Sequence, residues 1–549
     1  MENINPKIIE LIRSRGITEE EDYLELLAEK PKKTYDPFLL LNMEAGVDLI
    51  LSTIKQQKKI CIYGDYDADG ITATAILYTV LSDMTSNLEY YIPSRFEEGY
   101  GLNCEALDTI KNRGASLVIT VDLGSSAHEE VEYAKGLGLD IVVTDHHSIK
   151  GKKADCILIN PKQENCQYPF KELAGCGVAY KLAQGIQRRS GISKKSLNDV
   201  LDLLAIGTIG DIVPLIDENR TFSKYGISKI NATKRPGLVK LIEGVSLKPG
   251  NIKSESLAYV IVPHINAAGR IMEADLALEL LLKNTSTGID DMVGKLVESN
   301  RERRRLQEQT FLSLVEVIER DYKEKYFYLI YAEDAHEGIA GIVAGKLKEK
   351  YRRPVAIVTP SGEYLKGTSR SVEKINLYEL LKSKESHFIK FGGHSMACGF
   401  SMKKESYVEL QESLNRDVEI MLEQDEGLFD STLNPDLFID IKEITKPFCG
   451  ELEKLAPFGN GWPKPLLAIK NVTLSKVAYM GNERQHARFY IHDHSRASLA
   501  AVLFNKAAEN SALLESAMPV TVFGYPELSD YRGFTEIKFI VEKIENEVI

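Results

Sequence analysis

The sequence predicts an α/β protein with two α/β lobes joined by a long helix and followed by a small all-β barrel of the OB type. Three observations lead to this fold. From about residue 59, short apolar runs alternate with helical patterns, which is typical of βαβ units around a mainly parallel sheet. Residues 290–325 keep a helical period with neither glycine nor proline after Gly294. After about residue 446, short runs of alternating polarity indicate strands.

The first lobe is predicted at residues 55–288, after an N-terminal helical extension at residues 1–54. Its strands are the apolar runs KICIYGD, SLVITVD and DIVVTDHH, with helical stretches between them. A second α-rich segment continues through LDLLAIGTIGDIVPL to about residue 285. Open sheets of this class bind their ligands beyond the carboxyl ends of the strands. Polar residues that follow each run are therefore candidates for a functional site.

The connecting helix is predicted at residues 289–325 and the second lobe at residues 326–445. This lobe contains the strands FYLIYA and PVAIVT around the helix of GIAGIVAGKLKEKY. The barrel is predicted at residues 446–549. Its five strands are LLAIKNVTLSKV, HARFYIHD, SLAAVLF, PVTVFGY and FTEIKFIVEKI.

Composition limits the class of protein. Hydrophobic residues make up 44% and charged residues 27% of the chain, as in a globular protein. No apolar stretch approaches the ~20 residues of a membrane span, and the N-terminus lacks the layout of a signal peptide, so we expect a cytoplasmic protein without membrane contact. Seven cysteines without a CxxC pair indicate reduced thiols. The net charge of −12 argues against nucleic-acid binding only weakly, because binding depends on a local basic groove.

Acids and histidines follow successive apolar runs. Asp65, Asp67 and Asp69 follow the first, Asp122 the second, and Asp145, His146 and His147 the third, while Asp211 follows an apolar helical run. Any one of these motifs alone would most often be a turn or a helix cap. Together they would crowd carboxylates at one edge of a sheet, and only cations offset that repulsion. Oxygen-rich ligation with some imidazole suits Mn²⁺ or Mg²⁺, and several bridging acids suit two ions ~3.5–4 Å apart.

These motifs also carry a family resemblance. DYDADG, VDLG, DHH and GTIGDIVPL resemble the successive core motifs of the DHH phosphoesterase superfamily, in their usual order. The resemblance implies that two divalent ions are held by five ligands, namely Asp67, Asp69, Asp122, His146 and Asp211. It places His147 close to the scissile phosphate, so that Asp67, Asp122 and His147 are the expected catalytic residues. Asp65 and Asp145 are expected to support the ligands.

Further motifs are similar to those of the single-stranded-DNA exonucleases within this superfamily. They are Arg95–Leu102, Leu173–Ala179 and Pro263–Arg270. Three more motifs, His336–Gly338, Gly367–Ser371 and Gly392–His394, resemble those of the DHH-associated domain, which implies a substrate-binding domain at residues 326–445. The resemblance implies contacts to substrate phosphates from Asn266, Arg270, Ser369, Arg370, Gly392, Gly393 and His394. The chain departs from the family pattern in small ways: Gly210 where alanine is commoner, Thr368-Ser369 before the arginine, and Tyr63 where some relatives have histidine. The last change could weaken a metal site.

Two other groups of residues have competing interpretations. Arg301, Arg303, Arg304 and Arg305 could follow DNA phosphates, but a solvated helix face is favoured. The barrel aromatics could stack on bases, although most aromatics of a small barrel are core and only a minority is expected to touch DNA. These aromatics are Phe489, Tyr490, Tyr525, Tyr531 and Phe534.

The function implied by the resemblance is 5′→3′ hydrolysis of single-stranded DNA by two-metal catalysis, in DNA repair and recombination. The implied partners are single-stranded DNA, a RecQ-type helicase and a single-stranded-DNA-binding protein, and the expected state is a monomer. Two alternatives remain open. A phosphodiesterase for short oligonucleotides or cyclic dinucleotides would usually lack the barrel. A noncatalytic nucleic-acid-binding scaffold would lose metal ligands, and all five are present here.

Overall fold

The computed structural model of the protein describes residues 4–95, 98–99, 101–149, 151–430, 433–516, 518–531 and 534–546. Phe96, Glu97 and Tyr100 of the motif at 95–102 lie outside the described residues, as does the side chain of Tyr531. The chain divides into two compact units. The first contains Met1–Pro93, Tyr100–Val262 and Leu433–Ile549, and the second contains Ser94–Gly99 and Pro263–Thr432.

The predicted parallel sheet lies in the first unit and is confirmed. Its five strands are all parallel, in the order β2-β1-β3-β4-β5. They are β1 (Lys59–Gly64), β2 (Leu88–Tyr91), β3 (Ala115–Val121), β4 (Asp140–Thr144) and β5 (Ile157–Ile159). The chain passes from β1 to β2 on one side and then returns to β3 on the other. The order of the strands thus reverses between β1 and β3, which is where sheets of this class bind ligands.

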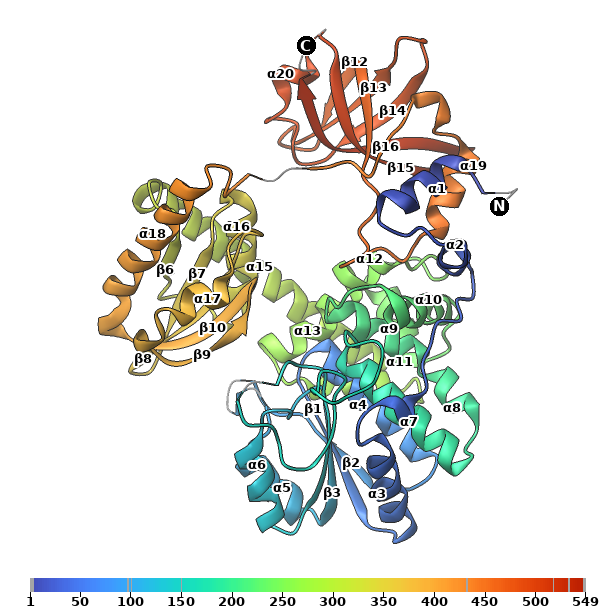
Figure 1. Ribbon diagram of the computed structural model, residues 1–549, viewed down its shortest axis with the longest axis vertical. Helices are drawn as coiled ribbons and strands as arrows, with labels where there is room; N and C mark the ends of the chain where they lie inside the picture. Colours follow the sequence, from blue (N-terminus) through green and yellow to red (C-terminus); the bar gives the residue numbers. More distant parts are fainter. Residues whose placement is uncertain are drawn as a thin grey trace. The chain divides into compact units, whose positions relative to one another are not determined.

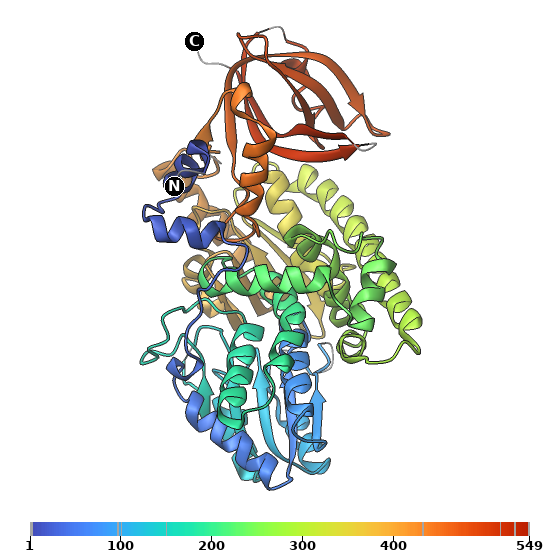
Figure 2. The ribbon, with the colours of Figure 1, turned by 90° about the vertical axis from the view of Figure 1, so that its right-hand side faces the viewer.

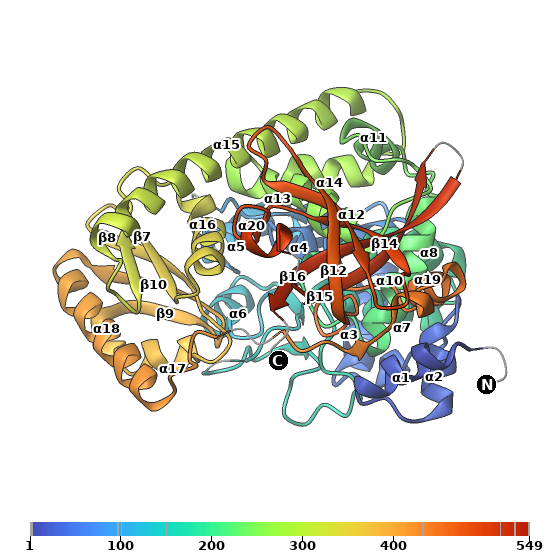
Figure 3. The ribbon, with the colours of Figure 1, turned by 90° about the horizontal axis from the view of Figure 1, so that it is seen from above.

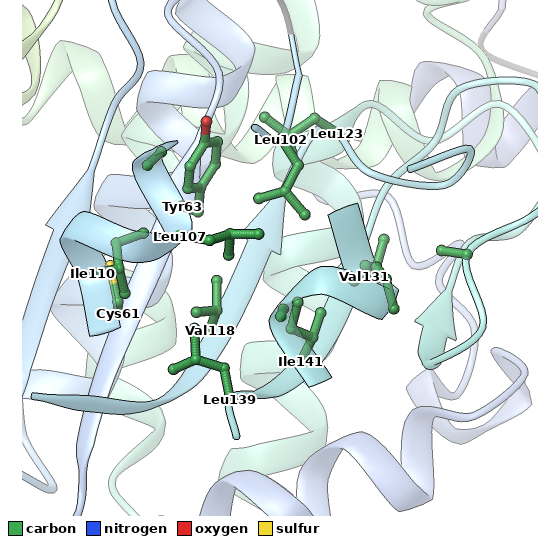
Figure 4. Packing of buried hydrophobic residues seen from close by; sticks show 14 of the residues in the cluster. Cys61, Tyr63, Leu102, Leu107, Ile110, Val118, Leu123, Val131, Leu139 and Ile141 are labelled. Atoms are coloured by element: carbon green, nitrogen blue, oxygen red, sulfur yellow. The ribbon is translucent and has the colours of Figure 1, made fainter. Parts of the chain in front are cut away.

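Helices cover both faces of this sheet (Figure 1). One face carries α5 (Cys104–Asn112) and α6 (His128–Gly136), whose apolar residues form one buried cluster with β1, β3 and β4. Figure 4 shows this cluster, in which Leu107 and Val131 point toward the sheet. The opposite face carries α3 (Met43–Lys55), α4 (Ala68–Ser82) and α7 (Gly175–Ser190). The strands are therefore buried on both faces, and only their ends are open to polar side chains.

A layer of helices continues the first unit beyond the sheet. Among them α9 is apolar on all sides and buried from Asp202 to Ile209, packed between α4 and α10. A hydrophobic helix of this kind can be stable only inside the protein. The elements of the layer are α8 (Lys194–Asp199), α9 (Leu201–Gly210), α10 (Asp217–Asn231), α11 (Pro236–Gly244), α12 (Ser254–Ser256) and the π-helical turn η2 (Leu257–Ile261).

The C-terminal strands form the predicted barrel, shown in orange and red in Figure 2. The sheet order is β11-β12-β13-β14-β16-β15, and β12 also pairs with β15, which closes the sheet on itself. All five strands predicted from the sequence are present. The strands and helices of this part are β11 (Leu437–Phe438), η5 (Ile441–Glu443), α19 (Lys446–Lys454), β12 (Leu467–Met480), β13 (His486–His492), β14 (Ser498–Leu503), α20 (Ser511–Leu514), β15 (Val520–Tyr531) and β16 (Phe534–Asn546).

The second unit contains the predicted long helix, α15 (Ile289–Asp321), which Figure 3 shows along its length. Arg301 and Arg305 pair with Glu298 and Glu302 on its surface, as expected for a solvated face. Arg303 differs: it is 9% exposed and donates to Asn300 and Gln307. The other helices of this unit are α13 (Val262–Ile271), α14 (Asp275–Leu282), α16 (Glu337–Tyr351), α17 (Leu377–Lys382), η3 (Glu385–His387), η4 (Lys404–Ser406) and α18 (Tyr407–Gln424).

The sheet of the second unit is mixed. Its order is β6-β7-β8-β10-β9, with one parallel pair, β6 and β7, around α16. The sequence predicted these two strands and the helix between them, but not the three antiparallel strands that complete the sheet. The strands are β6 (Tyr328–Tyr331), β7 (Val355–Ser361), β8 (Tyr364–Arg370), β9 (Phe388–His394) and β10 (Ala397–Lys403). Among the described residues, no helix has the length and apolar character needed to cross a membrane.

The N-terminal helices α1 (Pro6–Ser14) and α2 (Glu20–Leu27) and the short helix η1 (Pro37–Leu39) precede the sheet. The segment before η1 meets a buried ion pair between Lys181 of α7 and Glu218 of α10. Lys181 also donates to the Tyr35 carbonyl at 2.8 Å, and Glu218 accepts from the Tyr35 amide at 2.9 Å and from the Tyr168 hydroxyl. Burial lowers the pKa of Lys181, and the charge of Glu218 is the largest effect that opposes this shift. The pair thus joins the extension to the helical layer.

We expect Lys181→Met to lower the free energy of unfolding by about 3–5 kcal/mol, because it leaves the Glu218 carboxylate buried without its cation. The double variant Lys181→Met/Glu218→Gln should recover at least half of that loss, since the remaining amide carries no charge. Urea unfolding followed by circular dichroism measures both. If the free energy of unfolding of Lys181→Met lay within about 1 kcal/mol of that of the parent protein, as for an exposed ion pair, the buried pair would not have the proposed role.

Candidate metal centre

Three adjacent strand ends and one helix end bring the predicted acids and histidines together. Asp65, Asp67 and Asp69 follow β1, Asp122 follows β3, and Asp145 with the two histidines follows β4. Asp211 caps the C-terminus of α9. Since β1, β3 and β4 are neighbours in a parallel sheet, their carboxyl ends meet at one edge. This edge includes the position between β1 and β3 where the strand order reverses.

The N-termini of two helices hold the first motif in place. Asp67 caps α4, and its Oδ1 accepts hydrogen bonds from the Asp69 and Gly70 amides at 2.9 and 3.1 Å. Asp69 is aimed at the start of α7, where its two oxygens accept from the Gly175 amide at 2.6 Å and the Cys176 amide at 2.9 Å. The open amides and the dipole of a helix N-terminus both stabilise a carboxylate. These contacts fix the direction in which each acid points.

Asp122 is held in a strained backbone conformation. Its φ is +65°, in the left-handed region, and its amide donates to the Thr144 carbonyl at 3.0 Å. Non-glycine residues adopt this region rarely, and such strain is concentrated at functional sites. A Cβ on Gly175 would lie 2.4 Å from Asp122 Oδ1, so glycine is required there to let the start of α7 approach the carboxylate. The start of α7 therefore packs directly against the buried Asp122 carboxylate.

His146 lies among three carboxylates. Its Nε2 is 3.2 Å from Asp122 Oδ1, 3.4 Å from Asp211 Oδ2 and 4.0 Å from Asp69 Oδ2. Burial, followed by the neighbouring His147, lowers the pKa of His146 to about 4. The imidazole is therefore neutral at pH 7, which is the form that coordinates metal ions.

His147 is fixed by Asp145. Asp145 Oδ1 lies 2.7 Å from His147 Nδ1 and accepts from the His146 and His147 amides, while Oδ2 accepts from the Ser125 amide at 2.9 Å. Burial alone would raise the pKa of Asp145, but the hydrogen bonds and charge of His147 hold it well below its usual range. Asp145 thus fixes the ring of His147 and the backbone of His146. Its supporting role at the site stays a prediction.

The charges of the remaining acids oppose one another. Burial, and then the charges of Asp69, Asp67 and Asp211, hold the pKa of Asp122 well above its usual range. Burial and the same neighbours, Asp69 and Asp67, raise the pKa of Asp211. A cation between these groups would remove the penalty, because opposite charge favours the ionised carboxylates.

Several buried atoms of the site are suited to a metal ion. Asp122 Oδ1 and both ring nitrogens of His146 have no hydrogen-bond partner among the residues that the structure describes, which is costly for buried polar atoms. Three groups offer ligand atoms within 4.8 Å of one another: Asp122, His146 and His147; Asp69, His146 and Asp211; and Asp65, Asp67 and Asp122. Carboxylate oxygens with imidazole fit a hard or borderline divalent cation such as Mn²⁺ or Mg²⁺.

The structure brings two further residues into these groups. All five predicted ligands occur in these groups, and Asp65 and His147 also offer atoms within the same distance. Tyr63 does not join them. Its ring lies in the cluster beneath α5 (Figure 4), stacked on Tyr91 with centroids 5.4 Å apart, and its hydroxyl donates to the Gly101 carbonyl at 3.0 Å. Side chains alternate between the faces of a strand, which turns position 63 toward α5.

The residues predicted to contact phosphates all belong to the second unit. Arg270 donates to the Gly338 carbonyl at 2.7 Å, and Arg370 donates to the Ser369 carbonyl at 2.8 Å. Ser369 is buried and its hydroxyl donates to the Cys398 carbonyl at 2.9 Å. Asn266 lies half-buried on α13, about one helical turn before Arg270. Their role with phosphates stays a prediction.

Gly392, Gly393 and His394 end strand β9 and pair with β10. Gly393 has a φ of +151°, and a Cβ there would lie 2.3 Å from the Ala397 carbonyl oxygen. The close approach of β10 therefore explains why residue 393 is glycine, without any contact to a phosphate. His394 is exposed, and its Nδ1 accepts from the Met396 amide at 3.3 Å.

The aromatic residues of the barrel differ in exposure. Phe489 is buried, whereas Tyr490 on the same strand is 41% exposed, with Lys476 Nζ 5.3 Å from its ring centroid. Phe534 is 75% exposed, and Tyr525 is half-buried beneath Lys464. Of the five barrel aromatics named from the sequence, Tyr490 and Phe534 are the exposed ones among those with described side chains.

Two glycines of α9 provide a matched pair of variants. A Cβ on Gly207 would lie 2.2 Å from Thr72 Oγ1 and 2.8 Å from Asp69 Oδ1, whereas one on Gly210 would lie 3.2 Å from Ala68 Cβ. We expect Gly207→Ala to displace Asp69 and weaken Mn²⁺ binding at least about tenfold. Gly210→Ala should bind Mn²⁺ within about twofold of the parent while gaining up to about 1 kcal/mol of helix propensity. Titration calorimetry measures the Mn²⁺ affinity of both variants. Equal affinities would disprove the packing argument.

Comparison with protein families matches three parts of the chain. Residues 59–208 match the DHH family, N-terminal domain, residues 323–419 match the DHHA1 domain, and residues 435–543 match the RecJ OB domain. These three matches occur in the order that the sequence motifs predicted.

Curated relatives match along nearly the whole chain. The single-stranded-DNA-specific exonuclease RecJ of Bacillus subtilis (strain 168) is 35% identical over 97% of this chain and 67% of that protein. The protein of the same name from Haemophilus influenzae is 30% identical over 98% of this chain and 96% of that protein. The crystal structure of RecJ in complex with Mn²⁺ from Thermus thermophilus covers 100% of this chain and 76% of its own, with a TM-score of 0.83 and 25% identity. By the identity and the extent of these matches, the chain belongs to the RecJ family.

Proposed function

We propose that this protein is a metal-dependent exonuclease that hydrolyses single-stranded DNA from its 5′ end. The observation that carries the proposal is the buried group of acids around His146, whose unpaired atoms call for cations at the position where open α/β sheets bind ligands. The relatives named above are single-stranded-DNA-specific exonucleases, which supports the substrate class. The 5′→3′ direction and the role in repair and recombination come from the family resemblance.

Two divalent ions, Mn²⁺ or Mg²⁺, are proposed for this site. The residues that would hold them are Asp67, Asp69, Asp122, His146 and Asp211, with Asp65 and His147 near enough to contribute. When bound, such ions stabilise the charge that develops on a phosphate and favour deprotonation of water at neutral pH. The Mn²⁺ complex of the related Thermus thermophilus protein supports this choice of metal.

The chain's own side chains would orient the reaction. The hydrogen bond between Asp145 and His147 Nδ1 fixes the ring of His147, which we propose contacts the scissile phosphate. The helix contacts of Asp67 and Asp69, together with the strained Asp122, hold the ligand oxygens in place before substrate arrives. Such preorganisation avoids the cost of rearranging polar groups during the reaction. We propose Asp67, Asp122 and His147 as the catalytic residues.

We propose that the parts of the chain divide the work as the sequence predicted. Residues 55–288 carry the metal centre. Residues 326–445 bind the phosphates near the strand end through Ser369, Arg370, Gly392, Gly393 and His394, and Asn266 and Arg270, which precede the long helix, bind phosphates as well. The barrel at residues 446–549 holds incoming DNA through exposed aromatics such as Tyr490 and Phe534. A RecQ-type helicase and a single-stranded-DNA-binding protein are the proposed partners of a monomeric enzyme.

We expect the purified protein with Mn²⁺ to release mononucleotides progressively from the 5′ end of a single strand of roughly 40 nucleotides labelled at one end, several times the length that one OB fold covers. Asp122→Ala should reduce the rate at least about 10³-fold, because it removes a carboxylate that belongs to two of the ligand groups. Asp155→Ala is the matched control, since Asp155 is an exposed acid of the same unit that pairs with Lys135. Hydrolysis of duplex DNA of the same length tests the preference for single strands. Strands labelled at the 3′ end test the direction of hydrolysis.

Other outcomes would point to the alternatives. Cleavage of strands of two to five nucleotides without cleavage of the long strand would move the protein to the oligonucleotide phosphodiesterases. Binding of the long strand without cleavage, by the parent protein and Asp122→Ala alike, would favour a scaffold. Chelation of the metal should stop hydrolysis completely.

A further inference from the structure

The loop that follows Asp211, one of the candidate metal ligands, has a strained backbone at its first residue. It joins α9 to α10. Ile212 in the loop has a φ of +59° and Asp217, the first residue of α10, has a φ of +49°, so both non-glycine residues lie in the left-handed region. For a β-branched residue such as isoleucine this conformation is a true outlier. The Ile212 side chain is 70% exposed and contributes little packing. A conformation of this kind persists only where surrounding structure imposes it.

Asn460 supplies contacts that impose it. Its side-chain Nδ2 donates to the Ile212 carbonyl at 2.7 Å, and its own carbonyl accepts from the Leu215 amide at 2.8 Å. The two hydrogen bonds bracket the loop on either side of Val213 and Pro214. Asn460 lies 248 positions beyond Ile212 in sequence, in the segment between α19 and β12, and both residues belong to the first unit.

The turn that carries Asn460 is shaped to fit this loop. Gly459 and Trp462 exchange backbone hydrogen bonds of 2.9 and 3.2 Å, which fixes a tight turn. Gly461 has a φ of +68°, and a Cβ there would lie 2.8 Å from Pro214 Cβ. A Cβ on Gly459 would lie 2.7 Å from Leu215 Cδ1. Both glycines therefore allow the turn to lie directly against the loop.

The same turn is anchored to α10, the helix at the far end of the loop. Arg220 of α10 is buried, and its guanidinium donates to the carbonyls of Leu455, Ala456 and Pro457 at 2.8, 3.0 and 3.1 Å. The Trp462 indole donates to the Leu455 carbonyl at 2.9 Å. The segment at 455–462 thus bridges the start of the loop, at Ile212, and the helix that ends it.

We propose that Asn460 is a positioning residue for Asp211, and that through it the segment leading into the barrel sets the affinity of the metal centre. This inference rests on the metal site of the proposed function. Asn460 does not touch the ligand atoms; it fixes the carbonyl next to Asp211 and so the direction in which that carboxylate leaves the end of α9. Asp211 Oδ2 lies 3.4 Å from His146 Nε2, so a small rotation of its backbone would separate the two ligands.

The test compares Asn460→Ala with Asn434→Ala in the full chain. Both asparagines are exposed and precede β12 in the same C-terminal segment, so neither change leaves a cavity. Without DNA, titration calorimetry should show Mn²⁺ binding to Asn460→Ala weakened about tenfold, the lower end for partners outside the ligand shell. Asn434→Ala should match the parent. The apo melting temperatures should stay close together, and the hydrolysis rate of Asn460→Ala should recover at high Mn²⁺ concentration.

A double variant separates positioning from a general loss of structure. Asp211→Asn and Asp211→Asn/Asn460→Ala should bind Mn²⁺ equally, because Asn460 acts only through Asp211. Equal Mn²⁺ affinity of Asn460→Ala and Asn434→Ala would overturn the proposal, as would a tenfold loss that persists in the Asp211→Asn background. A parent protein that binds no Mn²⁺ would instead refute the metal site itself.

Discussion

The repulsion among buried carboxylates at one edge of a parallel sheet is the constraint on which this structure depends. Neighbouring strands β1, β3 and β4 end in acids, and α9 adds Asp211 to the same place. Burial weakens hydration of each charge, and every additional carboxylate raises the pKa of the others, as at Asp122. Without cations this arrangement would destabilise the fold. Backbone amides therefore hold the acids in place, and bound cations would supply the positive charge that offsets their repulsion.

Those backbone contacts explain much of the architecture around the sheet. The start of α7 binds both oxygens of Asp69, which requires that α7 reach the strand ends, and Gly175 allows this approach. The apolar helix α9 packs against α4 through Gly207, where a methyl group would strike Thr72. The helical layer beyond the sheet is thus more than a cover for its core. Together with α7, it determines where the oxygens of Asp69 and Asp211 lie.

The sequence predicts the parts of this protein whose signals are local. Apolar periodicity gives strands β1, β3 and β4 of the parallel sheet, the long helix and all five main barrel strands, but not the short outer strands β2 and β5. The motifs after β1, β3 and β4 give the acids and histidines of the edge. The sequence does not predict the antiparallel strands β8, β9 and β10, because glycines within them interrupt the apolar pattern. The hydrogen bond from Asn460 to the loop after Asp211 joins residues 248 positions apart, so no local sequence pattern predicts it. The orientation of Tyr63 toward α5 follows from strand alternation, which a motif comparison ignores.

A crystal structure of the protein grown with Mn²⁺, with anomalous diffraction recorded at the manganese edge, tests the central claim most directly. The account predicts two anomalous peaks ~3.5–4 Å apart among the strand-end acids, with His146 bonded to one of them through a ring nitrogen. A map with no peak at this edge, or with manganese bound only elsewhere, would show that the acids are stabilised in some other way and would contradict the account.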